Sequence, residues 1–299
     1  MNVLVTGNGS IGKKHVNSLI DLGVTPIVYT QFPDTNQNVQ YVKELDGINN
    51  VDIAIICSPT FRHLDDFKNI TSRINLSKVL IEKPVAISRK EALEIQKISK
   101  DQGIKVYVAF DMRFISKLQY VKRKIHQLIS EVRLVKISCG QYLPDWRPGV
   151  DYRKSYSSFP EKGGGVDLDL THEIDYMVWL FGSPEKIEYT KLDKVSSLEI
   201  RSADYFKGIY RYNNFIIDVE LDYFRKLDRK LIIFGENRDL LALDFIRDTL
   251  TIGDEKIITS GNDIKNSLWA ELQEFLHDEN PSNLCNLDES MEVLRLINR

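Results

Sequence analysis

The sequence predicts a two-domain α/β protein, in which a parallel sheet with helices on its faces precedes an α+β domain built on a larger mixed, mainly antiparallel sheet. Over the first third of the 299-residue chain, short apolar runs alternate with helix-period segments, as in βαβ units. A glycine-rich turn follows the first run. Further on, residues 217–223 alternate apolar and polar side chains, the pattern of a strand with one buried and one solvated face. The predicted domains span residues 1–118 and 119–299.

Each apolar run of the first domain is short, and the segments between the runs carry apolar residues at helical spacing. Residues 51–57 are apolar with one exception, as expected for a strand buried on both faces. Ser88 and Glu91 form a capping box that predicts the start of a helix, and Gly103 marks its end. The predicted strands are residues 3–5, 27–29, 51–57, 79–81 and 106–109, and the predicted helices are residues 11–22, 64–74 and 88–103.

The elements of the second domain are predicted from the helical spacing of apolar residues and from the two-residue alternation of strands. The sequence contains no internal repeat and no low-complexity linker. The clearest strand of this domain is the alternating segment 217–223. The predicted strands are residues 132–139, 217–223, 230–234, 240–243 and 256–258, and the predicted helices are residues 170–181, 264–276 and 287–297.

Composition and charge argue against several function classes. Apolar residues at 42% and charged residues at 28% are typical of a soluble globular protein. The formal net charge of −3 carries no long run of one sign, which argues against a nucleic-acid or anionic-membrane surface. No apolar run is long enough to span a bilayer and no leader precedes the first strand, so a cytoplasmic location is expected. Cys57, Cys139 and Cys285 are widely spaced and the histidines are few, so no metal site is expected.

The turn Gly7-Asn8-Gly9-Ser10-Ile11-Gly12 predicts dinucleotide binding. It lies between a predicted strand and a predicted helix, which is the context that the GxGxxG pattern requires. Backbone N–H groups at the start of the helix would face a pyrophosphate, and Gly12 would allow close helix–strand packing. A merely structural turn is the alternative. The first domain is therefore expected to be a Rossmann domain that binds NAD or NADP.

The end of the second predicted strand does not decide between these two cofactors. A carboxylate at this position accepts the ribose hydroxyls of NAD. This chain has Thr30 and Gln31 there, and the nearest acid, Asp34, lies several residues later. No arginine stands there to bind a 2′-phosphate. We expect Thr30 and Gln31 to contact the ribose, with affinities for NAD and NADP within about two orders of magnitude, roughly 3 kcal/mol.

Glu82-Lys83-Pro84 follows an apolar run that predicts a parallel strand. In open α/β sheets, ligands bind just beyond the carboxyl ends of the strands. A lysine at such a position can be desolvated and can move a proton to or from a substrate oxygen. Lys83 is therefore a candidate catalytic residue, and Glu82 and Lys83 are candidate cofactor contacts.

The segment from Ser58 to His63 follows the third predicted strand of the first domain. One interpretation is a proline-terminated strand followed by an ordinary helix start. The functional interpretation is a loop that passes over the nicotinamide ribose. The two interpretations are compatible, and the candidate cofactor contacts are Ser58, Pro59, Thr60 and His63.

Three glycines, Gly163 to Gly165, precede a segment in which Asp169 and His172 lie at the start of a predicted helix. Glycine lets a backbone pass close to a ligand. Asp169 and His172 are three residues apart and so share a helix face. A carboxylate beside an imidazole can orient it and stabilise its charged form, as a general base needs. The alternative is an acidic first turn that interacts with the helix dipole, with an incidental histidine.

The segment from Asp145 to Tyr156 mixes aromatic residues with cations. Arginine binds phosphate in a fork, and aromatic rings stack on bases or sugars. Arg147, Tyr152 and Arg153 are therefore candidate substrate contacts, together with Asp169 and His172. A solvated loop is the alternative.

Taken together, these segments resemble the Gfo/Idh/MocA family, named for glucose–fructose oxidoreductase and inositol dehydrogenase, and the resemblance runs nearly end to end. The residues that carry it are the glycine turn with His15 three residues past Gly12, Pro59-x-x-x-His63, Glu82-Lys83-Pro84, Arg113-Phe114, residues 163–175, and the closing helices with Glu271, Phe275, Leu276 and Leu294.

The resemblance implies a nicotinamide-binding Rossmann domain and a mixed-sheet domain that often makes the oligomer contact, hence a homodimer or homotetramer. It implies hydride transfer at a hydroxyl-bearing carbon of a sugar, cyclitol or nucleotide sugar. Lys83 and His172 would lie at the reacting hydroxyl, and Arg113 at the cofactor. Residues 145–156 and 172–182 are similar to members from bacterial surface-polysaccharide pathways, which suggests a nucleotide sugar as substrate.

Two positions depart from the family pattern. The family commonly has an aspartate four residues before its histidine, where this chain has Leu168, and the acid expected near Thr30 is absent. Two other functions fit the same fold. One is a nonenzymatic dinucleotide- or sugar-sensing regulator, which would not need both Lys83 and His172. The other is an eliminase or isomerase that uses the dinucleotide only transiently.

Overall fold

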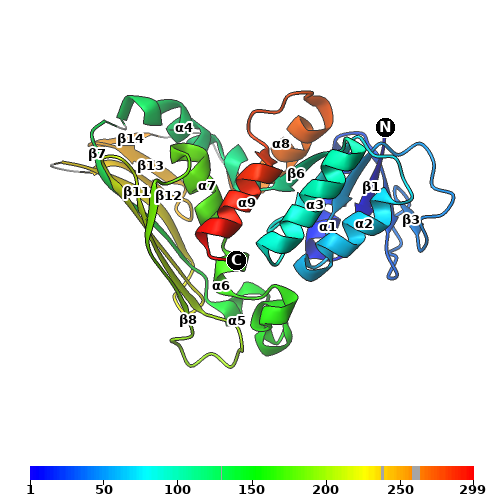
Figure 1. Ribbon diagram of the computed structural model, residues 1–299, viewed down its shortest axis with the longest axis horizontal. Coiled ribbons are helices and arrows are strands. Elements are labelled where there is room, and N and C mark those ends of the chain that lie inside the picture. The colour runs from blue at the N-terminus through cyan, green and yellow to red at the C-terminus, as the bar shows by residue number, and fades with distance from the viewer. Residues whose placement is uncertain (129, 237–238, 258–262) are drawn as a thin grey trace. The chain divides into compact units, whose positions relative to one another are not determined.

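The computed structural model describes residues 1–128, 130–236, 239–257 and 263–299, and it divides into two compact units (Figure 1). The first unit comprises residues 1–114 and 265–291, and the second comprises residues 115–264 and 292–299.

The first unit is built on a sheet with the strand order β15-β6-β5-β4-β1-β2-β3 among the described residues. All neighbouring strands are parallel except the short edge strand β15, which is antiparallel to β6. The order reverses between β1 and β4, which is the switch point where such sheets bind dinucleotides. The strands are β1 (Asn2–Thr6), β2 (Thr25–Tyr29), β3 (Gln40–Val42), β4 (Ile53–Ile56), β5 (Lys78–Glu82), β6 (Lys105–Ala109) and β15 (Cys285–Asn286).

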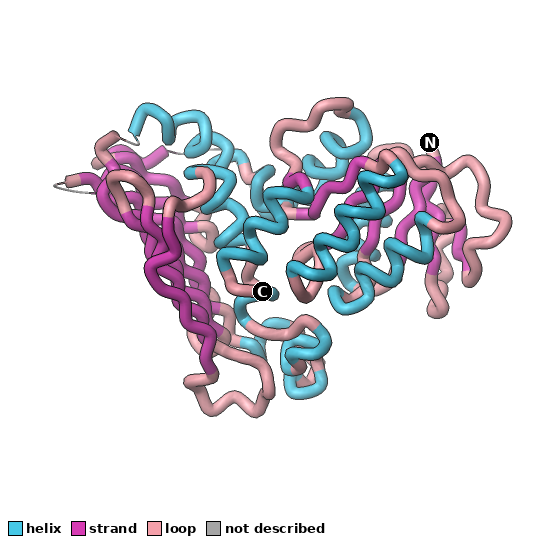
Figure 2. The backbone as a smooth tube through the Cα atoms, viewed as in Figure 1, coloured by secondary structure: helices cyan, strands magenta, loops and turns pink. Residues whose placement is uncertain are grey.

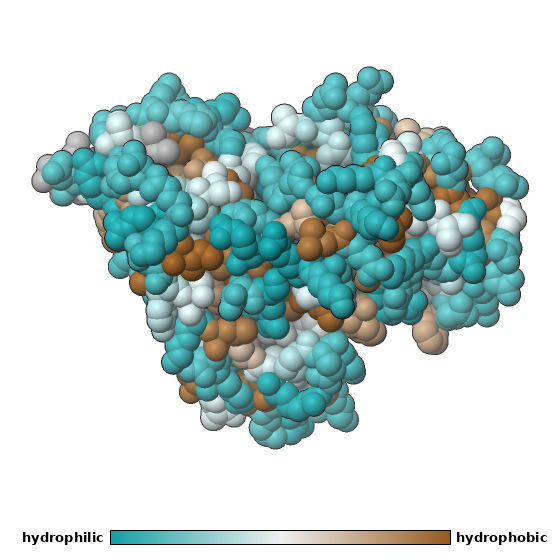
Figure 3. All heavy atoms as spheres, viewed as in Figure 1, coloured by the Kyte–Doolittle hydropathy of each residue, from teal (hydrophilic) through white to brown (hydrophobic). Residues whose placement is uncertain are grey.

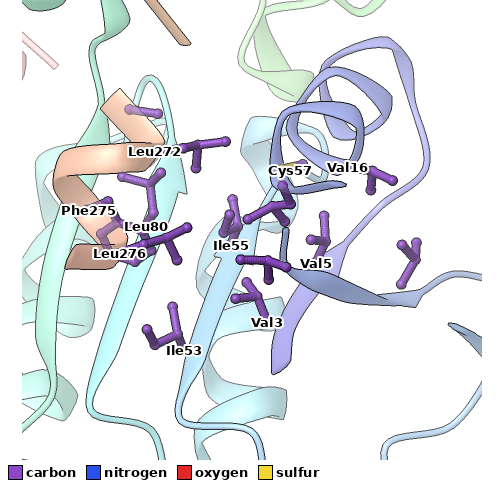
Figure 4. Close-up of a cluster of buried hydrophobic side chains, with 14 of the residues drawn as sticks. Val3, Val5, Val16, Ile53, Ile55, Cys57, Leu80, Leu272, Phe275 and Leu276 are labelled. Carbon is purple, nitrogen blue, oxygen red and sulfur yellow. The ribbon is translucent and has the colours of Figure 1, made fainter. Parts of the chain in front are cut away.

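Helices cover both faces of this sheet. One core cluster joins β1, β4 and β5 to α1 (Ser10–Asp21) and α8 (Asp263–His277), and Figure 4 shows Leu272 and Phe275 of α8 packed beside Leu80 of β5. On the other face lie α2 (His63–Thr71) and α3 (Arg89–Gln102), which contact each other, β4 and β6. Side chains on both faces of β1, β4 and β5 are thus buried, which explains the continuous apolar runs in the sequence.

The segment 265–291 departs from the predicted division at residues 118 and 119, because it packs with the first unit. Lys78 Nζ donates to the carbonyl oxygens of Phe275 and Asp278, at 3.2 and 3.0 Å, at the C-terminal end of α8. Strand β15 then extends the sheet beside β6. The apolar spacing of a helix shows which face is buried but not against which sheet, so the sequence did not reveal this return of the chain.

The second unit is built on a sheet with the order β14-β13-β12-β11-β7-β10-β9-β8 among the described residues. Within the part of this sheet that the structure describes, only β7 and β10 are parallel neighbours. Figure 2 shows α4 (Ser116–Leu128) and α7 (His172–Phe181) on one side of this sheet. The strands are β7 (Val132–Gly140), β8 (Lys186–Asp193), β9 (Tyr205–Arg211), β10 (Ile216–Asp222), β11 (Asp228–Gly235), β12 (Asp239–Asp244), β13 (Thr249–Ile252) and β14 (Glu255–Ile257). The remaining helices are α5 (Leu143–Trp146), α6 (Val166–Asp169) and α9 (Leu287–Leu296), the last of which begins in the first unit.

The alternating strand of the second unit is confirmed as β10, in which Ile217, Val219 and Leu221 are fully buried. Strand β8 was not predicted, because exposed and half-buried positions do not alternate regularly along it and a register shift interrupts its pairing. Residue 258, the end of the last predicted strand, lies outside the described residues. The sequence also missed β3, β9, β13, β15 and the helix α4.

The face of the molecule drawn in Figure 3 is mainly hydrophilic, with hydrophobic residues interspersed. No described helix has both the length and the apolar composition that a membrane crossing requires.

Candidate active site

The glycine turn has the shape that a phosphate-binding loop needs. Gly7 has a φ of +84°, and a Cβ on Gly12 would lie 2.3 Å from the Gly7 carbonyl oxygen. A Cβ on Gly9, by contrast, would meet no described protein atom within 4 Å. Helix α1 starts at Ser10 with no described side chain capping it and no acid in its first turn. Its N-terminal N–H groups therefore suit an anion, and the turn fits a dinucleotide pyrophosphate.

Glu82, at the end of β5, is held by two groups of the first unit. Its Oε1 lies 2.6 Å from His15 Nε2, and its Oε2 accepts from the backbone N–H of Lys83 at 3.2 Å. The sequence did not reveal this contact between His15 and Glu82. The buried ring of His15 projects from α1 to the end of β5 and fixes the carboxylate that precedes Lys83. The placement of His15 three residues past Gly12 was the available signal.

Lys83 lies just beyond the carboxyl end of β5 and is partly exposed. Strand β5 is separated from β1 only by β4, so Lys83 follows the same edge of the sheet as the glycine turn. This is the edge at which open α/β sheets bind ligands.

His63 joins two loops at this edge. Its ring is buried, with Nε2 2.8 Å from the carbonyl oxygen of Ser58 and Nδ1 3.1 Å from that of Pro84. Burial lowers the pKa of His63, although the carbonyl oxygens that face both ring nitrogens act in the opposite direction. These contacts give His63 a positioning role between the segment that begins at Ser58 and the one that follows Lys83. The cofactor contacts assigned to Ser58, Pro59, Thr60 and His63 remain predictions.

Arg113 is buried, and its Nη1 donates to Glu289 Oε2 at 2.9 Å. The same nitrogen lies 3.4 Å from the carbonyl oxygen of Asn283. The ion pair joins the end of the 3₁₀ turn at Asp111–Phe114 to the start of α9, within the first unit. These contacts give Arg113 a structural role, and its predicted contact with the cofactor remains a prediction.

Asp169 is held by two tyrosines of the second unit, which the sequence did not reveal. Tyr156 donates to Oδ1 at 2.8 Å and Tyr223 donates to Oδ2 at 2.5 Å. Burial, with the nearby Asp169 charge, raises the pKa of both tyrosines well above the ordinary range, so both remain donors at neutral pH. Both carboxylate oxygens are thus oriented by hydroxyl groups. Asp169 ends α6 and His172 begins the separate helix α7, so the prediction that the two residues share one helix face is wrong. That Asp169 orients the imidazole of His172 remains a prediction.

The glycines before Asp169 are required by close backbone packing. A Cβ on Gly164 would lie 2.3 Å from the Tyr156 carbonyl oxygen, and Gly165 has a φ of +132°. Asp167, between these glycines and Asp169, is buried and accepts from Arg299 Nε at 2.6 Å and Nη2 at 3.1 Å. Close backbone packing at Gly164 and the ion pair between Asp167 and Arg299 therefore both hold the segment that leads to Asp169.

His172 begins helix α7 and is partly exposed. The next residue, Glu173, is fully buried and lies 2.9 Å from Arg229 Nε of β11. A buried ion pair of this kind is costly to break, because the remaining charge would lack its partner. The start of α7, and with it His172, is thereby anchored to the sheet.

Arg147 lies beside two aromatic rings. Its guanidinium carbon is 5.6 Å from the ring centroid of Trp146 and 4.7 Å from that of Tyr156. Arg147 and Tyr152 also line one small hollow, together with Leu143, Trp146, Val150 and Ser155. The structure thus brings two of the three predicted substrate contacts of this loop together, and it joins the loop to Asp169 through Tyr156.

The third predicted contact, Arg153, is engaged locally. Its Nε donates to Asp151 Oδ1 at 2.9 Å and its Nη2 to Asp151 Oδ2 at 3.1 Å, and the side chain is half exposed. Asp151 also caps the short turn Tyr152–Lys154, because its Oδ1 accepts from the backbone N–H of Arg153 at 3.1 Å. A substrate phosphate would have to compete with Asp151 for this arginine.

The cysteines serve as packing groups. All three are buried, and burial raises the pKa of the Cys139 thiol to about 12 and that of Cys57 well above its ordinary range. Both thiols are therefore protonated at neutral pH. No cluster of potential metal ligands occurs among the residues that the structure describes.

Replacing Tyr223 by phenylalanine should lower the free energy of unfolding by about 1–3 kcal/mol, because buried Asp169 would lose one of its donors. Denaturant unfolding followed by circular dichroism would measure the change. Tyr205→Phe is the matched control, since Tyr205 is only partly buried and its hydroxyl lies 3.4 Å from Glu220. Equal losses in the two variants would contradict the role assigned to Tyr223.

Comparison with known proteins identifies the class of protein that this fold and site define. Residues 1–110 match the family model described as an oxidoreductase family with an NAD-binding Rossmann fold. Residues 119–240 match the model of the Gfo/Idh/MocA C-terminal domain. The chain therefore belongs to the Gfo/Idh/MocA oxidoreductase family, and its first domain is an NAD-binding Rossmann domain. The predicted fold class and the predicted nicotinamide cofactor are confirmed.

Two curated relatives show the range of chemistry among similar sequences. The chain is 26% identical over 168 residues to the 2,7-anhydro-N-acetylneuraminate hydratase of Escherichia coli, a match that covers 52% of this chain and 43% of the relative. It is 26% identical over 188 residues to the inositol 2-dehydrogenase of Rhizobium meliloti, covering 59% of this chain and 53% of the relative. The chain spans about half the length of the curated relatives that it matches.

A solved structure similar to this one is the WlbA dehydrogenase of Bordetella pertussis in complex with NADH and UDP-GlcNAcA. The TM-score is 0.78 at 17% identity, and the match covers 99% of this chain and 94% of that one. At this identity the similarity concerns the fold.

Proposed function

We propose that this protein is an NAD(P)-dependent oxidoreductase that transfers a hydride between the nicotinamide and a hydroxyl-bearing carbon of a sugar. The proposed substrate is a nucleotide sugar. The observation that carries the proposal is the position of Lys83, which follows the same sheet edge as a glycine turn shaped for a pyrophosphate. Glu82, fixed by His15, precedes this lysine and binds its backbone N–H. A proton-transfer group at that edge serves chemistry beside a dinucleotide.

The proposed roles follow from the surroundings of Lys83 in the first unit and of Asp169 in the second. Bound at the glycine turn, the dinucleotide would supply the hydride acceptor, or the donor in the reverse direction. In the oxidative direction the substrate carbon loses a hydride, its hydroxyl loses a proton, and a carbonyl forms. We assign Lys83 and His172 jointly to that hydroxyl: one accepts the proton and the other donates a hydrogen bond to the oxygen as it gains negative charge. Asp169, oriented by Tyr156 and Tyr223, is assigned to hold the imidazole.

The proposal of a nucleotide sugar rests on Arg147 and the two aromatic rings beside it. A guanidinium that lies beside two rings is a preorganised cation, and it suits the phosphate groups of a nucleoside diphosphate. Tyr152, which lines one small hollow with Arg147, adds a ring for the sugar or base. The nucleotide sugar in the WlbA complex, on a similar fold, supports this choice.

A second candidate function is favoured by one finding. A relative at 26% identity is a hydratase, and water addition or loss on a sugar can proceed through a dinucleotide that is reduced and then reoxidised. Such an enzyme would use the same lysine, histidine and cofactor. The nonenzymatic sensor is less well supported, because binding alone does not need two proton-transfer groups.

The test is to incubate the purified protein with NAD or NADP and a panel of UDP-, GDP- and dTDP-sugars. The absorbance of reduced nicotinamide and the mass of the sugar are then followed together. We expect reduced nicotinamide to accumulate with a product lighter by two hydrogens. A chemically changed sugar without accumulation of reduced nicotinamide would favour the second candidate, in which the dinucleotide is reduced only transiently. Binding of both ligands with no chemical change across the panel would favour the sensor.

A further inference from the structure

The loop after β2 folds back onto the glycine turn. Lys13 Nζ, from the first turn of α1, lies 2.7 Å from Asp34 Oδ2. A second contact joins the same two segments, because Asn8 Nδ2 donates to the carbonyl oxygen of Phe32 at 3.1 Å. Asp34 therefore lies beside the start of α1, although β2 itself ends at Tyr29.

The residues at the usual position of a ribose contact are engaged elsewhere. Thr30 is buried, and its hydroxyl accepts from the backbone N–H of Phe32 at 3.1 Å. The side-chain nitrogen of Gln31 donates to the carbonyl oxygen of Lys43 at 3.0 Å. In contrast, the side chains of Lys13 and Asp34 are 54% and 47% exposed, so a ligand can reach both.

We propose that Lys13 and Asp34 together set the preference between NAD and NADP. Asp34 accepts hydrogen bonds from the adenosine ribose hydroxyls of NAD, and Lys13 binds the 2′-phosphate of NADP. The inference rests on the proposed function only in that a nicotinamide dinucleotide binds at the glycine turn. It assigns the missing ribose contact to an acid brought back from the following loop.

Charge explains why one pair can serve both cofactors. A carboxylate favours the ribose hydroxyls and repels a 2′-phosphate, whereas an ammonium group attracts the phosphate. Each residue also partly neutralises the other, and each holds the other in its charged form. Lys13 does not hinder the binding of NAD. Its positive charge also weakens the repulsion between Asp34 and the 2′-phosphate of NADP. An exposed ion pair opens readily, since water and salt compete for both ends. The expected selectivity of the wild-type protein is therefore loose.

The test measures dissociation constants for NADH and NADPH by nicotinamide fluorescence, without any substrate. In Asp34→Asn, the ratio of the NADPH to the NADH dissociation constant should fall about tenfold, because the repulsive charge and one of the two acceptor oxygens are lost. In Lys13→Met, the ratio should rise about tenfold, because the phosphate loses its cation. Lys68→Met is the matched control, since Lys68 forms a comparable exposed pair with Glu94 at 2.6 Å, and its ratio should stay at the wild-type value.

Salt provides a second measurement. Raising the ionic strength should weaken NADPH binding more than NADH binding in the wild type, and this difference should shrink in Lys13→Met. Ratios within twofold of the wild type in both variants, or shifts in the same direction, would overturn the inference while leaving the dinucleotide site intact. Failure of the wild-type protein to bind either dinucleotide would overturn the inference and the proposed function together.

Discussion

Replacing Lys83 by alanine is expected to lower turnover about 10²- to 10⁴-fold, the usual cost of losing a positioned proton-transfer group. His172→Ala should fall in the same range. Both variants should retain dinucleotide binding, because the glycine turn and the first turn of α1 are unaltered. Steady-state kinetics with an active nucleotide sugar, together with NADH titration, would separate the two effects.

The control for this prediction is Lys90→Ala, which removes an exposed lysine seven positions further along the chain, in the first turn of α3. It should keep wild-type turnover. Turnover within a few-fold of the wild type in Lys83→Ala would remove the lysine from the mechanism. An equal loss of turnover in Lys90→Ala would show that removing any nearby positive charge lowers turnover, whatever its position.

Valine at Gly9 is expected to lower dinucleotide affinity about 100-fold or more, roughly 2.7 kcal/mol, while the fold is retained. The added side chain would meet no described protein atom at its Cβ, so it would instead occupy the space that the phosphates approach. NADH titration measures the loss, and thermal unfolding confirms that the variant is folded.

Gly12→Ala is the contrasting variant, because its Cβ would lie 2.3 Å from the Gly7 carbonyl oxygen. It should lower the melting temperature as well as the affinity. Unchanged affinity in a folded Gly9→Val protein would show that the dinucleotide does not approach this turn.

The first domain could be predicted closely because its signals are local. The run at residues 51–57 contains β4, and the capping box at Ser88 and Glu91 begins α3, where Ser88 accepts from the Glu91 backbone N–H at 3.4 Å. Parallel strands buried on both faces leave continuous apolar runs, and crossover helices leave clear 3.6-residue periods. Strand β8 leaves neither signal.

The parts of the site that could be predicted are those carried by short motifs. The glycine turn and Lys83 follow from their own spacing and from the strands before them. The partners of these residues could not be predicted, because they are distant in sequence. Tyr223 reaches Asp169 across 54 positions and Glu82 reaches His15 across 67, and only the folded sheets bring these groups together.

The position of Asp34 shows the same limit. In the sequence, Asp34 lies several residues beyond the position of the family's ribose contact, yet the loop brings it to Lys13. Likewise, the helical period of α8 did not show that this helix packs on the first sheet. Which acid serves a ribose, and which sheet a helix covers, depend on long-range contacts.

The most direct test of the central claim is a single-turnover experiment on the double variant Lys83→Ala, His172→Ala. The variant is loaded with NAD or NADP and mixed with the nucleotide sugar that the wild-type protein oxidises. Formation of reduced nicotinamide is followed over many wild-type turnover times. The account predicts bound dinucleotide and essentially no reduction, since neither group remains to take the hydroxyl proton or to stabilise the oxygen. Reduction at the wild-type rate would contradict it.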